Sequence, residues 1–336
     1  MGFGRLFLSL VVLLCVACSK NSDSSPSGTA KPIPVRVGIA IPSYVHAVAW
    51  IGKDAGYFEK QGLDVKVEVM GGSAATMRTL IAGKVDVGLA GGDAALKATA
   101  AGADLVVLAG LVNRFYHRLV VHESITNADQ LRGKTIGLPF LGGPQDMAVK
   151  VALKSLGLSH EKDVKVVSLG KEFNRMAALS RGEIHATTSQ TPAAELQKLG
   201  VKVLVDLPAQ DRAFPYMALV VTRDYLAKNR RAAKSFIEGL CAATAFYKAP
   251  KNREQSLAII AKYLRGSDAR GAADTRYRQA GPGLLSLPPR VEPAAFETVR
   301  SLAPAAVAKV PLDKALDSTL LDELVAEGGC PSASRP

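Results

Sequence analysis

Apolar and polar positions follow two alternating patterns from Val35 onward. Short apolar runs rich in Val, Ile and Leu, bounded by Gly or Pro, predict strands, and longer segments with apolar residues three or four positions apart predict helices. Strands joined by helices return to the same sheet as right-handed parallel crossovers. The pattern therefore predicts an α/β protein with mixed, mainly parallel sheets.

The pattern of strands and helices repeats after about one hundred residues. Four features recur 99 positions later: Asp64-Val65-Lys66-Val67 as Asp163-Val164-Lys165-Val166, Met77 as Met176, Leu80 as Leu179, and Gly83 as Gly182. This period is longer than the ~20 to 50 residues of a solenoid repeat. It predicts two similar lobes.

A second pair of matching strands marks the predicted hinge. Leu119-Val120-Val121 recurs as Leu219-Val220-Val221, and we expect the first strand to carry the chain into the second lobe and the other to bring it back. The first lobe is then residues 35–118 and 222–330, and the second is residues 119–221 with the hinge strands. The helix-like sequence after Thr222 is expected to pack on the first lobe and partly on the hinge.

The amino-terminal segment has the layout of an export signal. Arg5 precedes an apolar run from Leu6 to Ala17, shorter than the ~20 residues that span a bilayer. The run ends in Cys15-Val16-Ala17-Cys18, which resembles the lipobox of bacterial lipoproteins and implies a signal peptide of residues 1–17 and lipidation of Cys18. The alternative is an ordinary cleaved signal with a spare thiol. Both place the folded part outside the cytoplasm.

The Ser- and Pro-rich residues 18–34 are expected to form a flexible tether. Two cysteines, Cys241 and Cys330, remain in the body of the protein, in a compartment where disulfides persist. Cys241 stands in an apolar helical stretch, residues 236–242, which favours a buried free thiol. The five histidines lack the spacing of a metal site, so we expect no metal and no cofactor.

Loops after the carboxyl ends of the strands supply the candidate binding residues, because ligands of parallel sheets lie at that edge. Two lobes whose carboxyl edges face each other form a cleft. Seven loops qualify: 42–46, 71–73, 91–93, 113–115, 140–145, 170–172 and 189–191. From them we select Ser43, His46, Gly72, Ser73, Gly92, Asp93, Asn113, Arg114, Gly142, Gly143, Gln145, Gln190 and Thr191.

Several of these loops coincide with predicted helix starts. Ser73 and Asp93 are expected to be N-caps, and Pro144 and Pro192 to be first helical residues. Unpaired N–H groups at a helix start favour an anionic or strongly hydrogen-bonding ligand. The glycine pairs in these loops are also typical of turns, and they lack the spacing of a nucleotide phosphate loop.

Each of three residues allows two roles. Arg114 either contacts a carboxylate or sulfonate at two points or forms a hinge or interlobe salt bridge. Trp50, the only tryptophan, either lines the pocket or covers the core. Asp93 is interpreted as a cap rather than a ligand contact. No Ser/His/Asp order or carboxylate pair nominates a catalytic residue.

The sequence DAGYFEKQGLDV at 54–65 resembles a signature of periplasmic substrate-binding proteins of the sulfonate, nitrate and thiamine-precursor type. As in that family, Gly-Gly-Ser and a helix follow, then AGKVDVG at 82–88 and LRGKTIG at 131–137. The resemblance spans about residues 35–250. It implies a type II periplasmic-binding fold and, as partners, an ABC-type permease with its ATPase.

The same resemblance implies a function. The protein would be a receptor held by its lipid on the periplasmic side of the inner or outer membrane, closing on a small, anionic or aromatic solute such as a sulfonate, nitrate or a pyrimidine. One alternative is a sensory receptor that docks on a membrane kinase. Another is an enzyme like the pyrimidine-precursor synthases of this fold, which carry a cysteine-rich motif that this chain lacks.

Composition adds one question about charge. The 336 residues are 48% hydrophobic and 21% charged, which suffices for about two domains, and the net charge is +12. Residues 223–278 alone hold 13 basic and 5 acidic side chains. Export and the lack of interleaved aromatic residues argue against nucleic acid. We expect a solvated basic face, with contact to anionic lipid as the alternative.

Overall fold

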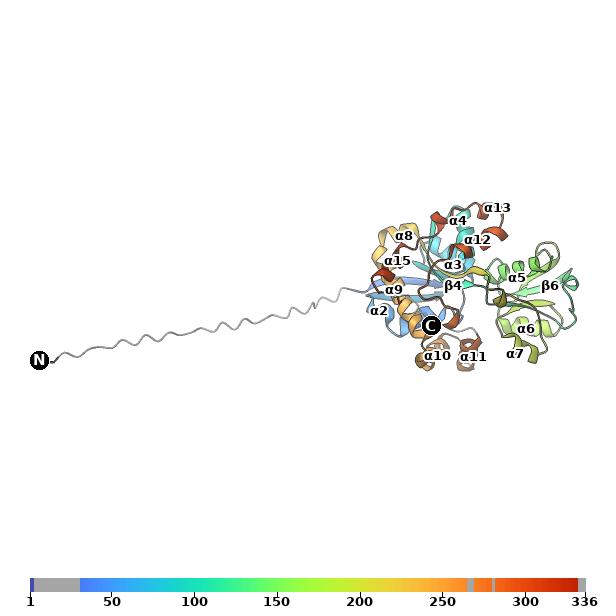
Figure 1. Ribbon diagram of the computed structural model, residues 1–336, viewed down its shortest axis with the longest axis horizontal. Helices are drawn as coiled ribbons and strands as arrows, with labels where there is room; N and C mark the ends of the chain where they lie inside the picture. Colours follow the sequence, from blue (N-terminus) through green and yellow to red (C-terminus); the bar gives the residue numbers. More distant parts are fainter. Residues whose placement is uncertain (3–30, 265–268, 280–281, 332–336) are drawn as a thin grey trace. The chain divides into compact units, whose positions relative to one another are not determined.

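The computed structural model describes residues 1–2, 31–264, 269–279 and 282–331 (Figure 1). The expected export signal, the expected lipidation site at Cys18 and most of the expected tether lie outside these ranges. Residues 1–31 and 32–336 are separate units, and the second contains both sheets. Within the described ranges, no helix is long and apolar enough to cross a membrane.

Two five-stranded sheets form the centres of two lobes. The first has the order β2 (Leu63–Val69), β1 (Ile33–Ile39), β3 (Val87–Ala90), β10 (Ala213–Thr222), β4 (Leu105–Arg114). The second has the order β7 (Val164–Ser168), β6 (Lys134–Leu138), β8 (Ala186–Ser189), β5 (Arg118–Val121), β9 (Lys202–Asp206). In each sheet only the fourth strand is antiparallel to its neighbours. The predicted fold class is confirmed.

The two sheets share one hydrogen-bonding register. Val37 of β1 pairs with Val67 and Val87, and 99 residues later Ile136 of β6 pairs with Val166 and Ala186. These parallel strands are apolar where they are covered on both faces, as in β3, whose four residues are all buried. The repeat in the sequence is therefore a repeat of the sheet itself.

The lobes exchange their fourth strands. β5, with Leu119, follows the first half of the repeat but lies in the second sheet, and β10, with Leu219, follows the second half but lies in the first. The chain thus crosses between lobes at residues 115–117 and 207–212. The predicted boundaries need two corrections, because residues 213–221 pair within the first sheet and β1 begins at Ile33, inside the predicted tether.

Helices cover the sheets. In the first lobe these are α1 (Ala47–Asp54), α2 (Tyr57–Lys60), α3 (Ser73–Ile81) and α4 (Gly92–Ala100), and in the second α5 (Pro144–Ser155), α6 (Glu172–Ser180) and α7 (Ala193–Lys198). After β10 come α8 (Arg223–Lys228), α9 (Arg230–Lys248), α10 (Arg253–Tyr263), α11 (Ala269–Gln279), α12 (Pro293–Leu302), α13 (Ala305–Ala308), α14 (Leu312–Ala315) and α15 (Thr319–Ala326). Short 3-10 turns are η1 (Asp129–Leu131), η2 (Pro208–Gln210), η3 (Pro250–Asn252) and η4 (Pro282–Leu284).

The carboxyl-terminal helices, orange to red in Figure 1, pack on the first lobe as expected. α9 contacts α1 and α15, and α12 contacts β10 and also α5 of the second lobe. Trp50 of α1 is buried and stacks on Tyr263 of α10, with ring centroids 4.8 Å apart. Of its two interpretations, the core position is the one observed.

Two predicted N-caps were wrong. α3 begins at Ser73 after Gly72, and α4 begins at Gly92 after Gly91. The Ser73 hydroxyl is engaged elsewhere, because it accepts the Gly91 N–H at 3.0 Å. Pro144 is the first residue of α5 as predicted, whereas Pro192 precedes α7 by one position.

A disulfide joins Cys241 of α9 to Cys330, which follows α15. Their Cα atoms are 5.4 Å apart and both side chains are buried. The expected free thiol at Cys241 was therefore wrong, because the packing of α15 on α9 brings the second cysteine to it. The bond closes a loop of 89 residues.

Four basic residues of 223–278 pair with acids from elsewhere in the chain: Arg223, Arg230, Lys234 and Lys262. Arg230 and Lys234 contact Glu323, and Lys234 also contacts Glu327. Lys262 contacts Asp54 of α1 at 2.8 Å. Part of the charge that is concentrated in the sequence is therefore offset in space, and the basic face stays a prediction.

Candidate functional site

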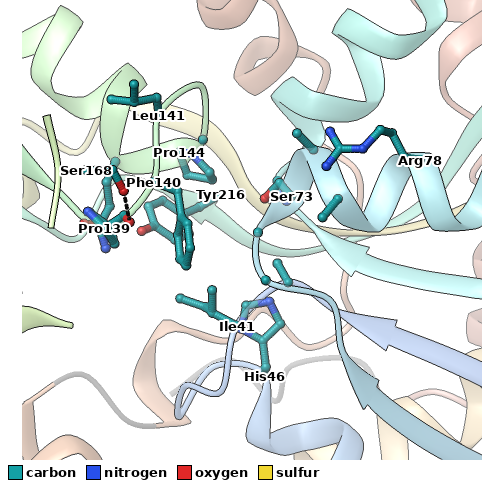
Figure 2. A pocket seen from close by; sticks show the side chains of 18 residues that line it. Ile41, His46, Ser73, Arg78, Pro139, Phe140, Leu141, Pro144, Ser168 and Tyr216 are labelled. Atoms are coloured by element: carbon teal, nitrogen blue, oxygen red, sulfur yellow. Dashed lines mark hydrogen bonds between the residues drawn. The ribbon is translucent and has the colours of Figure 1, made fainter. Parts of the chain in front are cut away.

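A cavity of about 300 Å³ lies between the two lobes, at the carboxyl ends of their strands (Figure 2). The first lobe lines it with Ala40, Ile41, His46, Gly71, Gly72, Ser73, Ala74, Ala75, Arg78, Gly91 and Tyr216, and the second with Pro139, Phe140, Leu141, Gly143, Pro144, Gln145 and Ser168. Figure 2 shows Phe140 and Tyr216 facing Ser73, Ile41 and His46 across it.

Five of the sequence-selected residues meet in this cavity: His46, Gly72, Ser73, Gly143 and Gln145. Three others do not line it but form hydrogen bonds with other residues. The Ser43 hydroxyl is 2.8 Å from His46 Nδ1, Gln190 accepts the Tyr44 hydroxyl at 2.6 Å, and the Gly142 carbonyl accepts Lys97 at 3.0 Å.

The remaining five selected residues have other positions. Gly92 lies against Pro215 and Phe296 of its own lobe. Asp93 pairs with Lys97, and the Asn113 amide donates to the carbonyls of Gly110 and Arg290. The Thr191 carbonyl accepts Arg118. Arg114 is more than half exposed and contacts Asp211 at 3.1 Å, so it forms the salt bridge that was its alternative interpretation.

Sequence reasoning missed Arg78 and Tyr216, two large polar side chains of the cavity. The sequence could have indicated Arg78. Ala74 and Ala75 directly follow the selected loop 71–73, and Arg78 stands one turn later on the same face of α3. Tyr216 had none, because the sequence placed its strand in the hinge. Ile41, Pro139 and Ser168 were also missed, and they lie beside loops that had been chosen.

The charge that lines the cavity is positive. Arg78 is the one lining residue with a full positive charge, and no Asp or Glu is among the described residues that line it. α3 and α5 both begin at its wall, one from each lobe. The first N–H groups of an α-helix lack partners within the helix and carry partial positive charge. The site is therefore suited to an anion.

His46 adds a buried polar group whose Nε2 has no hydrogen-bond partner among the described residues. Burial lowers the pKa of His46 to about 4, and the nearby Leu89 backbone offsets only part of this effect. The imidazole is thus neutral at pH 7. With Nδ1 held by Ser43 and Nε2 buried, His46 forms an uncharged part of the cavity wall.

Gln145 connects the cavity to the first crossing segment. Its Oε1 accepts the Thr188 hydroxyl at 2.7 Å, and its Nε2 lies 3.0 Å from Nε2 of His117. Burial, Arg175 and Arg118 together lower the pKa of His117 to about 3. The ring is therefore neutral and accepts the Gln145 N–H at Nε2, which places its own proton on Nδ1.

Residues 43–252 match the family model described as NMT1/THI5 like. The chain belongs to the NMT1/THI5-like family. A protein of Brucella abortus (strain 2308), whose name gives it only as a candidate binding protein, is 31% identical over 268 residues, 78% of each chain.

Two solved structures show the fold that this NMT1/THI5-like chain shares. The periplasmic aliphatic sulphonate binding protein SsuA from Escherichia coli has a TM-score of 0.62 at 21% identity, covering 90% of this chain and 94% of its own. The periplasmic nitrate-binding protein NrtA from Synechocystis PCC 6803 has a TM-score of 0.61 at 15% identity, covering 90% and 92%. The expected periplasmic-binding fold is confirmed.

The two buried histidines predict that this NMT1/THI5-like protein loses stability in mild acid. Each imidazole is neutral when folded, with pKa values of about 4 for His46 and about 3 for His117, but gains a proton near pH 6.5 when unfolded. Stability is thus constant above pH 6.5 and falls below it, until the folded pKa is reached. Between pH 7 and pH 5 we expect a loss of about 2 kcal/mol for each histidine.

Urea unfolding of the wild type and of His117→Gln at both pH values measures this loss. Glutamine keeps an acceptor for Gln145 but does not titrate, so the variant should lose about 2 kcal/mol less than the wild type. His122→Gln, on the outer part of the second lobe next to Ser124, is the control. Equal losses in the wild type and in His117→Gln would contradict the assignment.

Proposed function

We propose that this protein is an extracytoplasmic solute receptor of an ABC-type import system that closes its two lobes on a small organic anion with an apolar or aromatic body. The observation that carries the proposal is the cavity between the lobes, which has one cation, no lining carboxylate and a helix start from each lobe. Its volume of about 300 Å³ is that of a small-molecule site.

The two ends of the solute would have different surroundings. The anionic group would lie at the start of α3, where the free N–H groups of Ser73, Ala74 and Ala75 are followed one turn later by Arg78. The apolar body would contact Ile41, Pro139, Phe140 and Leu141.

Closure would be driven by the solute. A solute that touches α3 and the loop after β6 contacts both lobes together only when they are closed, so binding shifts the population towards that state. The crossings at 115–117 and 207–212 are the natural hinges, because they are the two places where the chain passes between the sheets.

Two solved structures with the same fold support this assignment by their names, which describe binding proteins for aliphatic sulphonates and for nitrate. A permease and an ATPase would be the partners of this receptor. Lipid on Cys18 would hold it to the membrane through the tether.

Thermal shift with benzenesulfonate tests the proposal, with benzenesulfonamide as an uncharged control of nearly the same shape. A ligand that binds the folded state alone raises the melting temperature by mass action. We expect the sulfonate to raise it and the sulfonamide to have little effect. If neither benzenesulfonate nor benzoate, nitrate or an alkanesulfonate raises it, the anion-receptor proposal fails.

Arg78→Gln should weaken benzenesulfonate binding about tenfold, because one charge-assisted contact with the anion is lost. Titration calorimetry measures the effect. Arg181→Gln is the matched control, since Arg181 is an exposed arginine at the end of the corresponding helix α6 and contacts only Glu183. Equal affinities in both variants would remove Arg78 from the site.

A further inference from the structure

A charge pair on α4 reaches from the first lobe to the second. Lys97 Nζ donates to Asp93 Oδ2 at 2.8 Å and to the carbonyl of Gly142 at 3.0 Å. Gly142 belongs to the loop 139–143 between β6 and α5. One ammonium group therefore ties a helix of the first lobe to a loop of the second.

The anchor of this lysine is buried. The Asp93 side chain is 0% exposed and its Oδ1 has no hydrogen-bond partner among the described residues, while Lys97 is 34% exposed. Burial raises the pKa of Asp93, and Lys97 works against that rise. A buried ion pair adds little net stability. The pair is therefore better explained by the bond of Lys97 to Gly142 than by the stability of the first lobe.

The repeat supports this interpretation. The positions 99 residues after Asp93 and Lys97 are Pro192 and Leu196, and Leu196 packs in the core of the second lobe. The shared fold of the lobes therefore does not require an ion pair at this place. The Asp93–Lys97 ion pair is present in the first lobe only, on the side of that lobe that faces the second.

The loop that Lys97 holds covers the cavity. Phe140 and Leu141 of this loop line it, and the Phe140 ring lies against Gly72 of the first lobe, 3.7 Å from where a Cβ would stand. Gly142, with φ of +76°, directs its carbonyl to Lys97, while its N–H donates to Asp146 Oδ2 at 2.7 Å. The loop is thus held at one residue by both lobes.

A second tie between the lobes is less accessible. The Tyr44 hydroxyl donates to Gln190 at 2.6 Å, and both side chains are buried. Lys97 is in contact with water, so its bond to Gly142 can be exchanged for water at lower cost. Of the two ties, the Lys97 bond is the one that can open first.

We propose that Lys97, anchored by Asp93, is a positioning residue that clasps the loop 139–143 over the cavity and sets the rate at which bound solute leaves. The part about solute release rests on the proposed function. The clasp itself is a property of the solute-free protein. The two can therefore be tested apart.

The test compares Lys97→Met with Lys150→Met in the full chain. Lys150 is a matched control, because it also pairs with a carboxylate, Glu161 at 2.7 Å, but within the second lobe and with a similar exposure of 27%. Asp93→Asn/Lys97→Met removes the clasp without leaving a lone buried charge. Lys97→Arg restores a cation that can reach both oxygens.

Hydrogen exchange of the Gly142 amide in the solute-free protein measures the clasp, and stopped-flow release of benzenesulfonate measures its consequence. We expect both to be about tenfold faster in Lys97→Met and in the double variant, with association unchanged and Lys97→Arg close to the wild type. Exchange at the rate of Lys150→Met would overturn the clasp. Faster exchange of the Gly142 amide with unchanged release of benzenesulfonate would overturn the role of Lys97 in release. If benzenesulfonate does not bind the wild type, that result counts against the proposed function. The exchange measurement still decides whether the clasp exists.

Discussion

Replacing Cys241 and Cys330 by alanine should lower the free energy of unfolding by about 4 kcal/mol, the largest stability change expected for this protein. The bond closes a loop of 89 residues, and a cross-link that spans so long a loop removes many conformations from the unfolded chain. The loop runs from α9 through α15, so its loss loosens the attachment of the carboxyl-terminal helices to the first lobe. Urea unfolding at pH 7 measures the change.

The single variants separate the bond from the packing of each side chain. Cys241→Ala and Cys330→Ala each remove the whole disulfide, so each should cost nearly as much as the double variant. Dithiothreitol should destabilise the wild type and leave the double variant unchanged. The disulfide contributes little if each single variant loses only a small amount of unfolding free energy, if the two losses add up to that of the double variant, and if dithiothreitol has no effect on the wild type.

The sheets could be predicted from the sequence because their signal is periodic. Strand period, helix period and the spacing of 99 residues agree, and the register of Val37 and Ile136 follows that spacing without a shift. The crossing of the chain at the strands of Leu119 and Leu219 was predicted, but the sheet that the Leu219 strand joins was not. Leu119 and Leu219 have matching sequences whichever sheet they join, and only the pairing partners, Thr188 and Leu89, decide it.

The sequence predicted the cavity residues that lie in loops. It did not predict the cavity residues whose side chains extend from helices and strands. His46, Gly72 and Gln145 follow strands, and topology alone places such residues at the carboxyl edge. Tyr216 lies inside a strand and was hidden by the wrong boundary. Asp93 was a plausible cap, but it stands in the first turn of α4, and its carboxylate pairs with Lys97 one turn later in the same helix.

Gly91→Ala should weaken benzenesulfonate binding by up to about a hundredfold, because it places a methyl group between the closed lobes. A Cβ at Gly91 would stand 2.7 Å from Cγ of Pro144 in the second lobe and would also crowd Asp93. Moving the lobes apart relieves the contact with Pro144. The contact with Asp93, whose Oδ1 is the nearest atom, lies within the first lobe and requires that carboxylate to shift. The movement of the lobes separates Arg78 and the start of α3 from Phe140, which the proposed solute must touch together. Titration calorimetry measures the loss.

Two further glycine variants distinguish blocked closure from general damage. Gly92→Ala also crowds its neighbours, with Pro215 at 2.7 Å, but those neighbours belong to the first lobe; it should lower the melting temperature and keep closure. A Cβ at Gly283, in η4 and outside the cavity lining, meets no atom within 4 Å, so Gly283→Ala should change neither property. Loss of affinity in Gly92→Ala equal to that in Gly91→Ala would assign the effect to the stability of α4. Loss confined to Gly91→Ala, together with a larger radius of gyration in X-ray scattering with benzenesulfonate present, would show that the solute binds tightly only between lobes that can close.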